Sequence, residues 1–438
     1  MRTYRRACPT LTGVVLCALL CAPAAAAEPL SLQHALRSAA GLDEDIASAE
    51  QELEAARADT ATAASDLLPT VNVAASRSHA NQEVVSGDVV LVKEDYWQAD
   101  INVSTPLVDP SAIGGLVAAD KERAAVRADL DLTLHEVLYG VVRAYYEALS
   151  AHSAIESARA SAETAKVLEE AARSRLAAGT ETVLGVDRAR ADRIAADGRV
   201  EQAVFAAEAA DLQLAHAANM PLQSFELDPP DRPQLPVRDS DARVDLALGG
   251  RPDLLSARFA AHSARASMAA AALRFSPVLQ LRWDWRYTDN TSFYGADYQE
   301  RWFLRLEAEW TLPGILEPGA SVARGKARRH QAVLAVERLE RDLSLEVRTA
   351  ELQLDAAEAA LRVAQERDAV AQANLDAGMR LYQEGLATGL EVTTLKDDRD
   401  IAAAVLVVAT LDRDLAEVDL LQVLGQDPMV AYGAEESP

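Results

Sequence analysis

Apolar residues recur along most of the chain at intervals of three and four, which is the spacing of one face of an α-helix. Two stretches keep this spacing for an unusual length, residues 111–178 and 319–384. A helix of that size is about 100 Å long, so no single core can enclose it and we expect helices packed along one another. The same pattern predicts four further helices at residues 32–67, 186–218, 252–275 and 391–424.

Four shorter stretches alternate apolar and polar residues instead, which is the period of a β-strand. One begins at Val71, and the others lie at residues 97–103, 278–287 and 302–310. One face carries tryptophan and aliphatic residues and the other carries mainly charged or amide residues, a pattern typical of membrane-spanning strands. We predict that lipid contacts Trp97, Ile101, Leu281, Trp283, Trp285, Trp302, Leu304 and Trp310. Four strands cannot close a barrel, so three chains would share one barrel of twelve strands.

The two halves of the chain repeat the same landmarks. Gly179 and Gly385 lie 206 positions apart, and Pro221 and Pro428 lie 207 positions apart. A constant offset of this kind indicates a tandem repeat. We therefore predict a first repeat at residues 28–227, a proline-rich linker at 228–243, a second repeat at 244–428 and a C-terminal tail at 429–438.

Residues 1–27 have the basic, then apolar, then small-residue order of a secretory signal peptide. All three cysteines, Cys8, Cys17 and Cys21, lie inside it, so we expect a mature chain without cysteine. Whether Cys21 is lipidated stays open. The longest later apolar run, residues 401–409, is too short for a transmembrane helix. Such an exported chain is either soluble outside the cytoplasm or inserted as a β-barrel.

Charge and chemistry exclude several classes of protein. The chain has 68 acidic against 43 basic residues and a net charge of −25, which argues against binding nucleic acid or anionic lipid through a basic surface. The seven histidines include no pair at a spacing of three or four, and no nucleophile or phosphate-binding motif is present. We therefore expect no enzyme activity, no metal and no cofactor.

The helix ends and strand entries carry recognisable short motifs. The first half contains Leu67-Leu68-Pro69-Thr70 before a strand and Val142-Arg143-Ala144-Tyr145 within a helix. The break in the second half reads Gly385, Thr388, Leu390, Glu391 and Val392; that in the first reads Gly179, Thr182, Leu184 and Val186, with Gly185 where an acid is common. In the order and repetition of these motifs, the chain resembles the TolC-type outer-membrane efflux channels over nearly all of its mature length.

This resemblance implies a mainly α-helical chain with a transmembrane β portion. It implies a homotrimer, in which a twelve-stranded β-barrel in the outer membrane continues as a twelve-helix α-barrel through the periplasm. The trimer would dock a periplasmic adaptor protein and an inner-membrane pump, and would serve as a passive exit duct for small molecules. Two alternatives stay open: an exit duct for type I protein secretion, and a soluble periplasmic coiled-coil scaffold. A periplasmic hydrolase would need a catalytic constellation that the sequence lacks.

The resemblance also implies functional sites at the helix breaks. Pore-gate candidates are Tyr382, Glu391, Asp398 and Asp187. Thr394 stands where a second gate aspartate is common, a departure from the family pattern. Candidate adaptor contacts are Gly179, Thr182, Gly385, Leu386 and Thr388.

Overall fold

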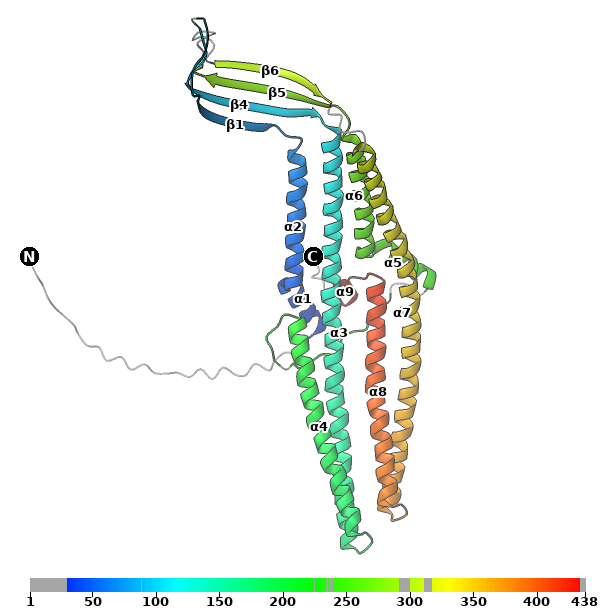
Figure 1. Cartoon of the computed structure of the whole chain (residues 1–438). Coiled ribbons are helices and arrows are strands. Elements are labelled where there is room, and N and C mark those ends of the chain that lie inside the picture. The colour runs from blue at the N-terminus through cyan, green and yellow to red at the C-terminus, as the bar shows by residue number, and fades with distance from the viewer. Residues whose placement is uncertain are drawn as a thin grey trace, which may run out of the picture.

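The computed structural model describes residues 30–87, 89–223, 225–233, 235, 239–290, 300–310 and 317–433. The predicted signal peptide lies outside these residues, as does the second half of the predicted tail, residues 434–438. The described chain is long and narrow, with a β-sheet at one end and the tips of two helical hairpins at the other (Figure 1).

Four long helices build the body of the molecule. They are α3 (Pro110–Ala177), α4 (Val183–Ala217), α7 (Glu317–Gln383) and α8 (Gly389–Val423). The α3–α4 and α7–α8 pairs form two hairpins that lie side by side, with α3 next to α8 (Figure 1). Each hairpin turns at a glycine with positive φ, Gly179 at 76° and Gly385 at 79°. Glycine adopts this backbone without a steric cost, so the predicted helix breaks are confirmed.

The shorter helices differ from the prediction at two points. The helix expected at 32–67 is two helices, α1 (Leu32–Leu42) and α2 (Glu44–Ser65), because Asp43 leaves the helical conformation and caps α2 by accepting the amide of Asp45 at 2.9 Å. Helix α5 (Ser240–Gly250) begins inside the range predicted as linker, because Asp239 caps it in the same way. Helices α6 (Pro252–Leu273) and α9 (Pro428–Ala431) complete the set among the described residues.

The sheet is antiparallel, with the strand order β1-β4-β5-β6. Its strands are β1 (Thr70–His79), β4 (Asp95–Val108), β5 (Val278–Thr288) and β6 (Glu300–Glu309). β1 and β6 therefore form its two edges. Trp310, predicted within the last strand, follows β6, and its indole N–H donates to the carbonyl oxygen of Phe275 at 3.0 Å. A small pair of strands, β2 (Val84–Ser86) and β3 (Val89–Val92), is not in the prediction.

Strand register places most of the apolar residues of the four strands on one face, with Phe303 on the other. Ile101 lies opposite Trp285, which in turn lies opposite Trp302. The other face carries ion pairs, for example Arg286–Asp100 at 2.5 Å and Arg282–Glu307 at 3.4 Å. The residues predicted to contact lipid within β4, β5 and β6 therefore share a face, although their contact with lipid stays a prediction.

The main core lies midway along the molecule, where α3 is surrounded by α1, α9 and the upper ends of α4 and α8. Tyr145 is fully buried there, with its hydroxyl 2.6 Å from the carbonyl oxygens of Leu30 and Asp228. Burial raises the pKa of Tyr145 to about 12, so the hydroxyl stays neutral and donates. The tyrosine thereby fixes the start of the first half, at Leu30, and its end, at Asp228, to the middle of α3.

No helix in the part of the chain that the structure describes is long and apolar enough to span a membrane.

Candidate functional site

The two hairpin tips lie at the end of the molecule far from the sheet (Figure 1), and Tyr382 of the second contacts Arg175 and Glu181 of the first. Between them is a groove with a volume of about 400 Å³, lined by residues of both tips. Its lining includes most of the predicted adaptor contacts, namely Thr182, Gly385, Leu386 and Thr388. Leu386 is 73% exposed, which leaves a large apolar side chain available at the end of the molecule.

The second tip is closed by a capping box at the start of α8. The hydroxyl of Thr388 accepts the amide of Glu391 at 3.3 Å, and the carboxylate of Glu391 accepts the amide of Thr388 at 2.7 Å. The backbone N–H and the hydroxyl of Thr388 both donate to this carboxylate and hold the pKa of Glu391 below its ordinary value. Glu391, a predicted gate residue, is therefore an ionised helix cap in this structure.

At the first tip, the backbone N–H of the capping threonine is hydrogen-bonded by a different residue. Thr182 caps α4 by accepting the amide of Gly185 at 3.1 Å, but Gly185 has no side chain to return the bond. Glu181 supplies the carboxylate instead, and accepts the amide of Thr182 at 3.0 Å. A Cβ atom at Gly185 would lie 2.4 Å from Oε1 of Glu181, so the missing side chain leaves room for that carboxylate.

Glu181 also joins the two tips. The hydroxyl of Tyr382 lies 3.4 Å from Oε2 of Glu181. Tyr382 itself is buried, with only 3% of its surface exposed. Arg175 donates to the carbonyl oxygen of Tyr382 at 2.6 Å and lies over its ring, 4.4 Å from the centroid. Burial and the charge of Glu181 raise the pKa of Tyr382, so its hydroxyl is a donor at neutral pH.

Of the predicted gate residues, only Tyr382 takes part in this contact between tips. Asp187 and Asp398 are both exposed, and Asp398 lies beside a separate groove lined by Val363 and Val370. Neither Glu181 nor Arg175 was predicted from the sequence to contact Tyr382. The available signal was an arginine and an acid near the first turning glycine and a tyrosine near the second. The tyrosine is 207 positions from Arg175 and 201 from Glu181, so no local pattern joins them.

Above the tips, a buried ion pair within α8 binds a serine of the other hairpin. Lys396 is 1% exposed, and its ammonium donates to Asp400 at 2.6 Å and to the hydroxyl of Ser161 at 3.1 Å. Ser161 belongs to α3 and the ion pair belongs to α8, so the hydrogen bonds of Ser161 with Lys396 and Asp400 hold one hairpin against the other. A buried ion pair stabilises this arrangement only when both partners are present.

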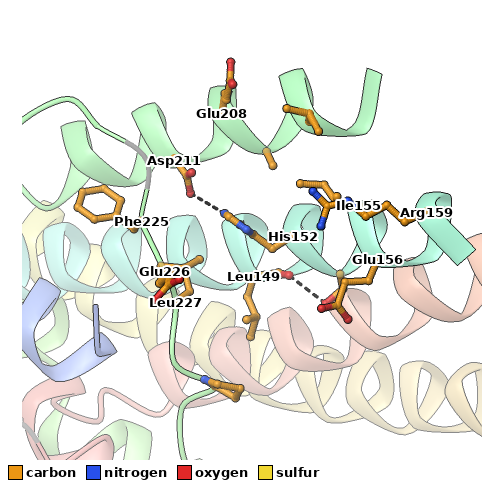
Figure 2. A pocket seen from close by; sticks show the side chains of 14 residues that line it. Leu149, His152, Ile155, Glu156, Arg159, Glu208, Asp211, Phe225, Glu226 and Leu227 are labelled. Atoms are coloured by element: carbon orange, nitrogen blue, oxygen red, sulfur yellow. Dashed lines mark hydrogen bonds and ion pairs between the residues drawn. The ribbon is translucent and has the colours of Figure 1, made fainter. Parts of the chain in front are cut away.

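A further groove lies near the middle of the molecule, between α3, α4 and the chain that follows α4 (Figure 2). Its volume is about 670 Å³, and a ring nitrogen of His152 lies 3.0 Å from the buried carboxylate of Asp211. Among the described residues there is no group of three or more metal-ligating side chains. The histidine gives a buried carboxylate its partner, which is sufficient reason for the pair.

The fold has close counterparts among solved structures. The outer membrane protein VceC from Vibrio cholerae matches with a TM-score of 0.76 and 19% identity, over 90% of this chain and 96% of that one. The CmeC outer membrane channel of Campylobacter jejuni matches with a TM-score of 0.75 and 17% identity, over 90% of this chain and 85% of that one. The open state of the MtrE outer membrane channel of Neisseria gonorrhoeae matches with a TM-score of 0.73 and 19% identity, over 90% of this chain and 89% of that one. No curated protein sequence matches the chain.

The sequence itself matches one protein family, described as outer membrane efflux protein, over residues 35–220 and 244–426. These two ranges cover most of the chain. The match confirms the predicted family, the outer-membrane location and a role as a channel in place of an enzyme. The chain belongs to the outer membrane efflux protein family.

Proposed function

We propose that three copies of this chain form a passive exit duct for small molecules. The observation that carries the proposal is the open four-stranded sheet, which has one apolar face and two edge strands, β1 and β6. An edge strand presents unpaired backbone groups, which have no partner in a lipid bilayer unless another strand supplies one. Pairing β6 of one copy with β1 of the next would satisfy both edges and close a barrel of twelve strands.

The long helices support the same assembly. Helix α3 has 68 residues, which corresponds to about 100 Å, and it runs from the end of the sheet to the tip of the first hairpin. Three copies of the helical body would continue the barrel as a helical tube away from the membrane. The wall of such a tube holds no energy source, so an inner-membrane pump would drive export through a periplasmic adaptor.

We assign adaptor docking and gating to the hairpin tips. The exposed side chain of Leu386 and the groove between the tips offer an adaptor both an apolar contact and a recess. The contact of Tyr382 with Glu181, strengthened by Arg175, holds the two tips together. Docking that separated the tips would have to break this contact. The acidic balance of the chain favours a cation-preferring duct, and an anion-selective pore in a reconstituted bilayer would contradict that expectation.

The native mass of protein extracted from membranes in mild detergent tests the assembly. We expect a trimer of roughly 130 kDa, which is the mass of three chains after signal cleavage. A water-soluble monomer or dimer would overturn the duct and favour a periplasmic scaffold.

Export is tested in cells that lack the chain. Sensitivity to small toxic molecules should rise and should return to normal when the gene is restored. Unchanged sensitivity together with loss of a secreted polypeptide would assign the duct to protein secretion instead.

A further inference from the structure

Helices α4 and α7 each carry a row of exposed apolar residues that nothing in the single chain covers. Each residue of these rows is between 45% and 69% exposed. On α7 the row is Leu334, Leu345, Leu352, Val363, Val370 and Leu381. On α4 it is Val183, Ile194, Phe205 and Leu212. Within each row the intervals are 11 or 7 positions, which correspond to three or two helical turns, so each row follows one side of its helix.

The row of α4 and the upper part of the row of α7 lie on the side of the helix turned away from the packed interior, while Val363 and Val370 border the open groove beside α8. On α4, Ile194, Phe205 and Leu212 each stand two positions before a buried residue, these being Ala196, Ala207 and Leu214. On α7, Leu352 stands two positions before the buried Leu354. Two positions correspond to about 200° around a helix. Both helices are therefore apolar on two opposite sides, and only one of these sides has a partner within the chain.

The two rows occupy opposite lateral edges of the lower body. Helix α4 packs mainly on α3, and α7 packs on α8, so α3 and α8 separate them (Figure 1). A ring of identical copies brings the α4 edge of one copy against the α7 edge of the next. This is the arrangement in which a surface on one side of a subunit meets a different surface on its neighbour.

The two rows also match in height. Helix α4 begins and α7 ends at the tips, which the contact between Glu181 and Tyr382 holds at one level. Rotation about an axis along the helices leaves every residue at its height. Counted from the tip, Ile194 and Leu212 lie 11 and 29 positions from Val183, and Val370 and Leu352 lie 11 and 29 positions from Leu381. In an antiparallel pair, these positions therefore face each other.

We propose that the apolar row of α4 packs against the apolar row of α7 in the neighbouring copy, with Val183 facing Leu381, Ile194 facing Val370 and Leu212 facing Leu352. Phe205, 22 positions from Val183, inserts about one turn from Val363, which is 18 positions from Leu381. This seam rests on the proposed trimer and specifies which surfaces join its copies. Leu345 and Leu334 continue the row of α7 above the height at which α4 ends.

Paired cysteines test the seam and its register. The natural cysteines are Cys8, Cys17 and Cys21, all in the predicted signal peptide, so the mature chain should give no background. The matched variants are I194C/V370C and L212C/L352C. The controls recombine the same four positions as I194C/L352C and L212C/V370C. A disulfide needs Cα atoms within about 7 Å, whereas the control pairs would differ in height by about 27 Å.

We expect oxidation of the matched variants to give covalent dimers and trimers on a non-reducing gel, and the control variants to stay monomeric. Any bond must join two copies, because α3 and α8 lie between the two positions within one chain. The native mass of each variant is measured alongside. A trimer whose matched pairs do not react, or whose control pairs react equally, would overturn the seam and leave the rows for another occupant such as the adaptor. A native mass below that of a trimer would overturn the proposed function itself.

Discussion

At the scale of single residues, the ionised cap at Glu391 gives the second tip a dependence on pH. Its folded pKa lies below the ordinary value of 4.5 because the backbone N–H and the hydroxyl of Thr388 donate to the carboxylate. A lowered folded pKa contributes stability that is complete above the unfolded pKa and is lost as the pH falls through the folded one. We predict that hydrogen exchange at the start of α8 accelerates, relative to the rest of the helix, as the pH falls below 4.5.

The variant Glu391→Gln provides the control, because an amide oxygen can still accept a hydrogen bond but does not titrate. Its relative exchange at the start of α8 should change little over the same pH range. Thr388→Ala should instead lower the local stability by about 1 kcal/mol at neutral pH, since it removes the helix cap. Equal pH dependence in the wild type and Glu391→Gln would show that another group titrates there.

The tip residues also show what the sequence could and could not reveal. The turning glycines follow from local motifs, and the structure confirms them. Thr182 and Thr388 belong to the same motifs, and the structure shows that each caps the helix that follows. The use of Glu181 in place of a capping acid at Gly185 depends on where its side chain points, which no local pattern specifies. Its contact with Tyr382 crosses 201 positions, so it exists only once both hairpins are side by side.

At the scale of elements, helices α3 and α6 approach each other closely at a glycine. A Cβ atom at Gly114 would lie 2.8 Å from Cβ and 2.9 Å from Cα of Ala270 on α6. Since the second contact is with backbone, the helices would have to separate. We predict that Gly114→Ala lowers the free energy of unfolding by about 1–3 kcal/mol, measured as a lower thermal midpoint of the detergent-solubilised protein.

The neighbouring Gly115 is the matched control, because a Cβ atom there would have no atom within 4 Å. Gly115→Ala should leave the midpoint unchanged or raise it, since alanine favours a helix over glycine by up to about 1 kcal/mol. Equal destabilisation by both substitutions would mean that the loss of stability comes from backbone freedom in α3 and not from close packing of Gly114 on α6.

Element boundaries were predictable where a periodic pattern ended at a glycine or proline, as it does for the long helices. The break at Asp43 was not, because the apolar spacing continues from α1 into α2 and only the cap interrupts the backbone. The strands β2 and β3 were missed because three or four residues are too few to establish a period.

At the scale of the whole molecule, the tryptophan face of the sheet and the apolar rows on α4 and α7 lie where the membrane or another copy would cover them in the proposed trimer. The alternation of the strands predicted one such surface from the sequence alone. The strand order β1-β4-β5-β6 and the equal heights of the rows on α4 and α7 could not be predicted, because both depend on how the two halves of the chain lie together. Large uncovered apolar surfaces on one chain support the proposed assembly.

The two faces of the sheet can be distinguished at adjacent positions of β6. Leu304 and Phe303 are both large, apolar and exposed, but Leu304 lies opposite Trp283 on the tryptophan face and Phe303 lies opposite Asp284 on the charged face. Both are near the centre of the strand. If the tryptophan face contacts lipid, Leu304→Arg places a charge near the middle of the bilayer, at a cost of about 2–4 kcal/mol per chain.

Phe303→Arg places the same side chain on the face that already holds Arg282, Arg286 and their acidic partners, where water and Asp284 can accommodate it. We therefore predict that Leu304→Arg sharply reduces the amount of trimer in isolated outer membranes, measured by native electrophoresis, while Phe303→Arg assembles near the wild-type level. The reverse result would place the tryptophan face in the lumen. Equal tolerance of both substitutions would mean that neither face lies in lipid, because a bilayer penalises a charge on the face that it touches and a water-filled lumen does not.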